Sequence, residues 1–103
     1  MPLPSNARKL QRIADCFRGV AHPTRLQILD LLRVAGPMSP VQLAVEIQPR
    51  LPLGSVAHHT RELRRLGLVT PAGTEPVRGA LQHFYKLSPL GAKLVGFADE
   101  LAT

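Results

Sequence analysis

The sequence predicts a single, mainly helical domain that contains one small β-hairpin. Three observations lead to this prediction. Apolar residues recur at helical spacing in five separate segments, proline and glycine punctuate the boundaries between segments, and a pattern suited to strands occurs only within residues 68–87. At 103 residues the chain is long enough for one modest hydrophobic core, and no linker or repeat marks a second domain.

Two helices are expected in the first third of the chain. The first covers about residues 6–18 and ends near Gly19, because apolar side chains recur at helical spacing up to that glycine. The second opens at His22-Pro23, since proline suits the first helical turn, and ends before Gly36. Its many leucine and isoleucine side chains predict that it is the central helix of the core.

A helix-turn-helix layout follows within residues 39–67. Ser39 and Pro40 together signal the start of a third helix, which ends near Ile47. Two prolines keep the next loop non-helical, because each lacks a backbone donor and restricts the residue before it. A fourth helix then runs to about Gly67. The connector is longer than the tight turn of the motif.

The hairpin is predicted over residues 68–87. Residues 68–70 have the pattern of a short strand, residues 71–79 that of a turn-rich stretch, and residues 80–87 alternate as a returning strand. Ser88 and Pro89 then start a final helix that extends to about Leu101.

The fourth predicted helix has an apolar side and a cationic side. A step of about 100° per residue groups four residues on the apolar side, namely Val56, Leu63, Leu66 and Gly67. The opposite side carries Ala57, His58, Arg61 and Arg65, with Arg64 at its margin. Within a chain of formal charge +6, three arginines against Glu62 favour contact with nucleic acid over a merely solvated charged face.

Three segments resemble the ArsR-like winged helix-turn-helix transcription regulators. They are residues 19–29 (GVAHPTRLQIL), residues 55–63 (SVAHHTREL) and residues 78–85 (RGALQHFY), the last similar to the wing strand of one branch of the family. The order of predicted elements matches as well, so the resemblance extends over nearly the whole chain. It implies that residues 1–103 form one winged helix-turn-helix domain, with the motif at 39–67 and the wing at 68–87.

The resemblance also implies a site for double-stranded DNA. In the family the second helix of the motif enters the major groove, which puts nearest the base edges Ser55, Ala57, His58 and Arg61. Arg64 and Arg65 would then be placed to contact DNA phosphates. Arg78, on the wing, would be placed to contact the DNA backbone or an adjacent groove. An arginine can pair bidentately with guanine, and a small Ala57 permits close approach or meets a thymine methyl group.

A homodimer is the third implication of the resemblance. The terminal helices, about residues 6–18 and 88–101, carry more apolar side chains than a thin core needs. We expect the interface to contain Leu10, Ile13, Phe17, Leu90, Leu94, Phe97 and Leu101. Two recognition helices would meet successive major grooves, so a pseudo-palindromic site with half-sites roughly 34–36 Å apart is expected.

The chain departs from the family in two respects. Where an apolar residue usually follows the paired histidines it has Thr60, expected beside the core and able to bond back to a helical carbonyl. Residues 40–47 lack cysteine, and residues 88–103 lack both cysteine and histidine, so the family's metal-sensing sites are expected to be missing. Adjacent His58 and His59 point about 100° apart, unlike a metal-binding pair. We expect His58 to face the groove and His59 to be partly buried.

Other classes of site have little support in the sequence. Glycine-rich phosphate loops and nucleophile motifs are absent, so no catalytic residue, cofactor or enzymatic activity is expected, and no effector can be named. The single cysteine, Cys16, is interpreted as a packed thiol, with a redox sensor or an intermolecular bridge as the alternative. No run of eighteen apolar residues and no signal peptide occurs, which predicts a cytoplasmic protein without membrane contact.

The sequence therefore predicts a homodimeric, sequence-specific regulator of transcription that binds double-stranded DNA, more often a repressor in this family. The alternative is a winged-helix module for protein–protein interaction within a larger regulatory complex. That alternative would require apolar side chains on the outer face of the motif's second helix. RNA binding is less favoured, because the predicted strands lack paired aromatics for stacking unpaired bases.

Overall fold

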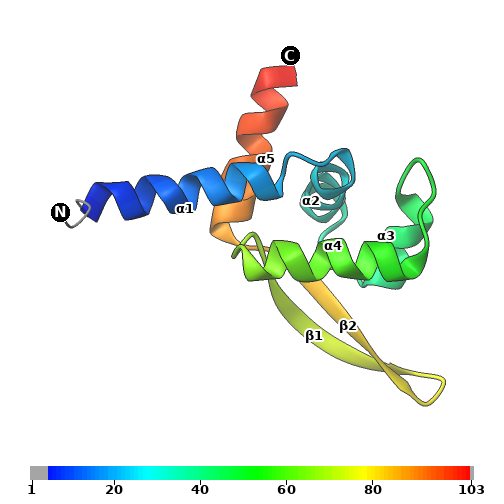
Figure 1. Cartoon of the computed structure of the whole chain (residues 1–103). Coiled ribbons are helices and arrows are strands. Elements are labelled where there is room, and N and C mark those ends of the chain that lie inside the picture. The colour runs from blue at the N-terminus through cyan, green and yellow to red at the C-terminus, as the bar shows by residue number, and fades with distance from the viewer. Residues whose placement is uncertain (1–4, 103) are drawn as a thin grey trace.

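The computed structural model describes residues 5–102 and contains, over that range, five helices and one antiparallel hairpin. This confirms the predicted mainly helical winged helix-turn-helix fold. In chain order the elements are α1 (Ser5–Gly19), α2 (Pro23–Ala35), α3 (Pro40–Glu46), α4 (Leu53–Arg65), β1 (Val69–Val77), β2 (Ala80–Leu87) and α5 (Pro89–Ala102). Figure 1 shows α2, α3 and α4 gathered into a body, with α1 projecting from it as an arm and the hairpin extending on another side.

The core lies among α2, α3, α4 and the start of β1. Its fully buried side chains are Ile28, Leu29, Leu43, Ile47, Val56, Leu63, Leu68 and Val69. Burying each such side chain stabilises the fold by about 1.5–3 kcal/mol. Helix α2 contributes Ile28, Leu29 and the nearly buried Leu32, which confirms its predicted place at the centre of the core.

A capping box fixes the start of α3, as the Ser39-Pro40 signal predicted. The Ser39 hydroxyl accepts a hydrogen bond from the Gln42 backbone N–H at 3.3 Å, and the Ser39 N–H donates to Gln42 Oε1 at 3.1 Å. The pair satisfies backbone donors that a helix start leaves without partners. Gln82 of β2 also donates to the buried Ser39 hydroxyl, which ties the hairpin to the same point.

Helix α4 ends earlier than the sequence predicted. Its last residue is Arg65, while Leu66 caps it and Gly67 adopts a positive φ of 77°. Gly67 is exposed and therefore does not belong to the buried side, where the angular projection had placed it. The projection assumed a continuous helix, whereas a left-handed glycine ends one and lets the Leu68 N–H bond back to Leu63 O at 2.9 Å.

The predicted position of Thr60 beside the core is confirmed. Thr60 is buried, with a relative exposure of 1%, and its hydroxyl donates to the Val56 carbonyl at 2.9 Å. The back-bond satisfies the hydroxyl without a partner from another element. A polar residue is therefore tolerated on the inward face of α4.

The hairpin is longer than predicted. Strand β1 continues to Val77, so most of the stretch assigned to a turn is paired with β2. The pairing register shifts between Pro71 and Thr74, where Gly73 has φ 117°. This irregularity accommodates residues that do not pair regularly with β2. The turn itself is only Arg78-Gly79, both with positive φ as a two-residue type I′ turn requires.

One short pairing lies outside the predicted elements. Met38, between α2 and α3, exchanges two backbone hydrogen bonds with Tyr85 of β2, at 3.0 and 2.9 Å. Tyr85 and Met38 also pack against the core. The bridge anchors the base of the hairpin to the helical body, which leaves only its far end free.

Helix α5 divides its apolar residues between two faces. Gly91 and Val95 are buried against the body, whereas Leu90, Phe97 and Leu101 are 45%, 48% and 73% exposed. Among the described residues, no helix has the length and apolar character needed to cross a bilayer.

Candidate nucleic-acid interface

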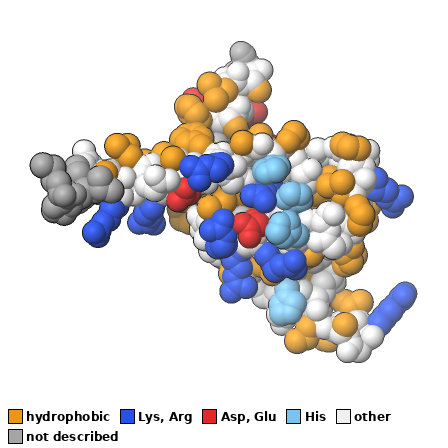
Figure 2. All heavy atoms as spheres, in the orientation of Figure 1, with side chains coloured by type: hydrophobic (Ala, Val, Ile, Leu, Met, Phe, Trp, Pro, Cys, Tyr) orange, Lys and Arg blue, Asp and Glu red, His pale blue; other side chains and the backbone are white. Residues whose placement is uncertain are grey.

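The outward face of α4 is the strongest candidate for contact with a nucleic acid. Val56, Thr60 and Leu63 are buried, so the helix is anchored by one side. The predicted contact residues on the other side are exposed or half-buried: His58, Arg61, Arg64 and Arg65 are exposed, and Ser55 and Ala57 are half-buried. Figure 2 views the molecule from this side and shows basic and histidine side chains gathered around an acidic side chain at the centre of the face.

The arginines of this face differ in their pairing. Arg65 donates from Nε and Nη2 to Glu62 Oε2, at 3.0 and 2.9 Å, while remaining 66% exposed. These hydrogen bonds hold the pKa of Glu62 below its ordinary value. Within residues 5–102, neither Arg61 nor Arg64 forms an ion pair with an acidic side chain. Two guanidinium groups are therefore unneutralised on this surface, and the third shares its charge with Glu62.

Arg78 occupies a separate position at the tip of the hairpin. It is exposed and has φ 50°, in the turn that joins β1 to β2. The hairpin carries this turn away from the helical body (Figure 1). The structure therefore brings together the predicted contact residues of α4 but leaves Arg78 as an isolated cation at a distance from them.

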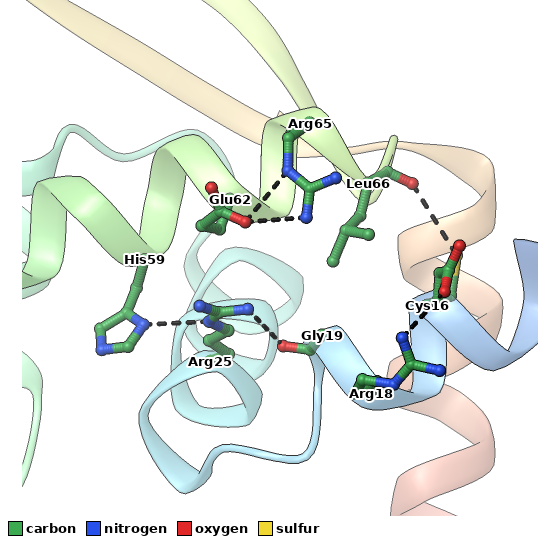
Figure 3. A network of polar contacts seen from close by, with 9 residues as sticks. Cys16, Arg18, Gly19, Arg25, His59, Glu62, Arg65 and Leu66 are labelled. Atoms are coloured by element: carbon green, nitrogen blue, oxygen red, sulfur yellow. Dashed lines mark hydrogen bonds and ion pairs between the residues drawn. The ribbon is translucent and has the colours of Figure 1, made fainter.

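A buried arginine lies behind α4, and no sequence pattern marks it as part of the site. Arg25 of α2 is only 9% exposed; its Nε donates to His59 Nδ1 at 3.0 Å and its Nη1 donates to the Gly19 carbonyl at 2.8 Å (Figure 3). His59 is half-buried, as predicted, and its ring lies 5.7 Å from those of both His22 and His58. Arg25 thus joins α2 to the end of α1 and to the middle of α4.

His59 should make the stability of the fold depend on pH. Burial first, and then the positive charge of Arg25 and the neighbouring His22 and His58, lower the pKa of His59 in the folded chain. The unfolded chain, with a histidine pKa of about 6.5, therefore binds a proton more readily. The stabilisation is complete above that pH and is lost as the pH falls through the unfolded value toward the folded one. We expect a lower melting temperature at about pH 5.5 than at about pH 7.5.

The variant His59→Asn isolates this effect, because asparagine keeps an acceptor near the position of Nδ1 but does not titrate. Melting curves recorded by circular dichroism should fall less steeply toward acid for this variant than for the wild type. Equal slopes for the two proteins would assign the acid sensitivity to other groups.

Five of the seven predicted dimer residues line one groove beside α1 and α5, namely Ile13, Phe17, Leu90, Leu94 and Phe97. Leu10, Ile13 and Phe17 of α1 are 61%, 42% and 47% exposed. The Phe17 ring packs edge-on against Phe97 of α5, with 6.3 Å between centroids, and both rings line this groove, whose volume is about 630 Å³. Leu90, Phe97 and Leu101 are exposed alongside it, whereas Leu94 is half-buried and packs against the core.

Cys16 lies in the same groove. Its side chain is half-buried, and Sγ lies 3.9 Å from the Leu66 carbonyl, toward which the thiol donates a weak hydrogen bond. This position fits the packed-thiol interpretation, and the redox alternative stays a prediction. Over residues 5–102, no three histidine, cysteine or acidic side chains are grouped so that they could hold a metal ion.

Comparisons with known proteins agree with this geometry. The model of a family described as a helix-turn-helix domain matches residues 20–72. An uncharacterised helix-turn-helix-type transcriptional regulator of Methanocaldococcus jannaschii, MJ1325, is 27% identical over 93 residues, which cover 90% of this chain and 98% of that protein.

Solved structures share the fold. The winged helix-turn-helix DNA-binding domain Mb0332 of Mycobacterium bovis, a homodimer described as a possible ArsR-family regulator, superimposes with a TM-score of 0.75 at 22% identity, covering 98% of this chain and 87% of that one. Reduced HlyU of Vibrio cholerae gives a TM-score of 0.74 at 23% identity, with 96% and 97% covered. Rv0081 of Mycobacterium tuberculosis gives 0.70 at 26% identity, with 96% and 91% covered.

Proposed function

The chain belongs to the helix-turn-helix domain family, in the winged form, and from this premise we propose that it is a sequence-specific regulator of transcription that binds double-stranded DNA as a homodimer. The observation that carries the proposal is the division of α4 into a buried apolar face and an exposed face with Arg61, Arg64 and Arg65. A helix of this kind can lie in a major groove without any change in the core beneath it.

Roles can be proposed for the individual side chains. Arg61 has no acidic partner among the described residues and lies in the middle of the exposed face, which suits a bidentate contact with guanine. Ser55, Ala57 and His58 precede it on the helix and would approach neighbouring base edges. Arg64 and Arg65 lie in the last turn of α4, where they would contact DNA phosphates. Arg78 would contact the DNA backbone or the groove beside the main contact.

The proposed dimer rests on the apolar surface of α1 and α5. A lone protomer would leave in water the large side chains of Leu10, Phe97 and Leu101 together with their neighbours. The related fold of the Mycobacterium bovis domain is homodimeric. Two protomers joined through these helices would present two α4 helices, and we expect half-sites roughly 34–36 Å apart.

Three finer points belong to the same proposal. We propose that the regulator is a repressor, that it acts in the cytoplasm, and that it catalyses no reaction. A reporter gene placed behind the selected DNA site should lose expression when the protein is supplied. The protein-interaction alternative has less support, because the outer face of α4 carries His58 and arginines where such a module needs apolar side chains.

The proposal is tested by selection of binding sites from random duplex DNA, followed by titration with the selected site. Arg61→Ala should weaken binding to that site by about 1–3 kcal/mol and relax the preference at one or two base pairs. Arg65→Ala should instead weaken all sequences similarly and reduce the slope of log affinity against log salt by about 1.

Arg33→Ala serves as the matched control, because Arg33 is an arginine of α2 whose two acidic partners, Asp30 and Asp99, both lie outside the candidate interface. It should leave both the affinity and the salt slope unchanged. If the wild type selects no sequence, or if Arg61→Ala and Arg65→Ala both bind like the wild type, the proposed interface is wrong.

A further inference from the structure

Helix α1 is joined to the rest of the molecule near its C-terminal end. Figure 1 shows its N-terminal half projecting away from the body. The contacts that hold it involve its last turns: Phe17 against Phe97, the Cys16 thiol toward Leu66 O, and the bond from Arg25 to Gly19 O. The direction of the arm therefore depends on a small set of interactions beside the end of α4.

Gly19 meets α4 at close range. A Cβ on Gly19 would lie 1.9 Å from Leu66 Cδ1, so the end of α1 rests directly on the residue that caps α4. Arg25 of α2 completes this junction, because its two hydrogen bonds run to Gly19 and to His59 in opposite directions (Figure 3). One guanidinium thus contacts the end of the arm and the middle of α4 at once.

We propose that Arg25 is a positioning residue that sets the direction of the α1 arm relative to the DNA-reading helix α4, and thereby the spacing of DNA half-sites that the dimer accepts. The inference rests on the proposed function, since it assumes that α1 pairs the protomers and that α4 reads DNA. The planar fork of arginine supplies two donors at a fixed angle, which the single ammonium of lysine cannot reproduce. Arg25 itself does not need to touch DNA.

The same junction should respond to protons. His59 accepts the Arg25 bond at Nδ1, so a proton on that nitrogen removes the acceptor and places a cation against the guanidinium. The charged and titratable groups around it are Arg25 of α2, His22 before α2, and His58 and Glu62 of α4. Glu62 is engaged by Arg65, and the remaining neighbours are basic, so this environment opposes protonation until the solution is acid.

The experiment compares the affinity for two half-sites with the affinity for a single half-site, in duplexes whose half-site separation is varied one base pair at a time. The ratio of the two affinities reports the arrangement of the two α4 helices, because direct contacts at one half-site are common to both measurements. For the wild type, the ratio should peak at one separation and fall between about pH 7.5 and pH 5.5.

Arg25→Lys should keep the single half-site affinity close to that of the wild type and lower the peak ratio by roughly 2–30-fold, with a broader dependence on separation. Arg33→Lys is the matched control on the same helix and should reproduce the wild-type profile. His59→Asn is the second variant, which retains an acceptor and should keep the wild-type peak at neutral pH while losing its acid sensitivity.

Two results together support the proposal: a broadened profile for Arg25→Lys and a ratio independent of pH for His59→Asn. The proposal is overturned if the wild type binds its paired site and Arg25→Lys shows the wild-type dependence on half-site separation. It is equally overturned if His59→Asn shows the wild-type dependence on pH. If Arg25→Lys does not fold, the His59→Asn profile decides alone. Failure of the wild type to bind any duplex would instead refute the proposed function itself.

Discussion

Replacing Gly91 by alanine is expected to destabilise the fold by about 3 kcal/mol, at the upper end of the usual cost of overpacking. A Cβ at this position would lie 2.0 Å from the Leu68 carbonyl oxygen and 3.0 Å from its carbonyl carbon. The obstacle is backbone, and it is held in place because Leu68 O accepts the Ser88 N–H at 3.1 Å. Helix α5 would have to move away from the start of β1 to make room.

Thermal unfolding followed by circular dichroism at a fixed protein concentration measures the effect. For a chain of this size, 3 kcal/mol corresponds to a fall in melting temperature of roughly 12–24 °C. Gly96→Ala is the matched control in the same helix, because nothing lies within 4 Å of a Cβ built there. It should stabilise the chain by about 0.4–1 kcal/mol through helix propensity and loss of unfolded-state entropy. An alanine at position 91 that melts with the wild type would contradict the close packing of α5.

Phe97→Glu should separate the proposed dimer and lower the affinity for a paired DNA site by about 10²–10⁴-fold, the advantage that linkage of two binding modules provides. Phe97 is 48% exposed in the protomer and lies against Phe17 beside the groove. A carboxylate there would lose its hydration when a second protomer covered it, and it would take away the apolar contact that the Phe97 ring makes with Phe17. Sedimentation should show a single chain at micromolar concentration.

Val34→Glu is the control for this second result. Val34 is 76% exposed on α2 and lies outside the proposed interface, so the same chemical change should leave the sedimentation and the DNA affinity unaltered. Circular dichroism should show that both variants keep their helices. A Phe97→Glu protein that remains dimeric and binds the paired site normally would exclude this surface as the interface.

The sequence was sufficient for the helices and for the face of α4, because both depend on local patterns. Apolar spacing located each helix, the Ser39-Pro40 signal marked the start of α3, and a rotation of 100° per residue separated Leu63 from Arg61. Errors arose where the backbone left the regular pattern. Gly67 ends α4 with a positive φ, and β1 extends through residues that have poor strand propensity but are paired across the hairpin.

Features that depend on distant contacts could not be predicted. The partners of Arg25 lie 6 and 34 residues away, so the sequence shows only an arginine in the first turn of a helix. Met38 pairs with Tyr85 as a single residue, which produces no alternating pattern. The close approach of Gly91 to Leu68 is equally invisible, because a helical glycine carries the same local signal whether it is packed or free.

The two prolines of β1 also have a consequence for self-association. A two-stranded sheet has two open edges, and an open edge invites pairing with the strands of other molecules, which leads to aggregation. Pro71 and Pro76 provide no N–H groups for such pairing along β1, and Met38 already occupies part of the free edge of β2. Replacing these prolines by threonine would improve strand propensity, but it would also provide a template on which hairpins from different molecules could assemble.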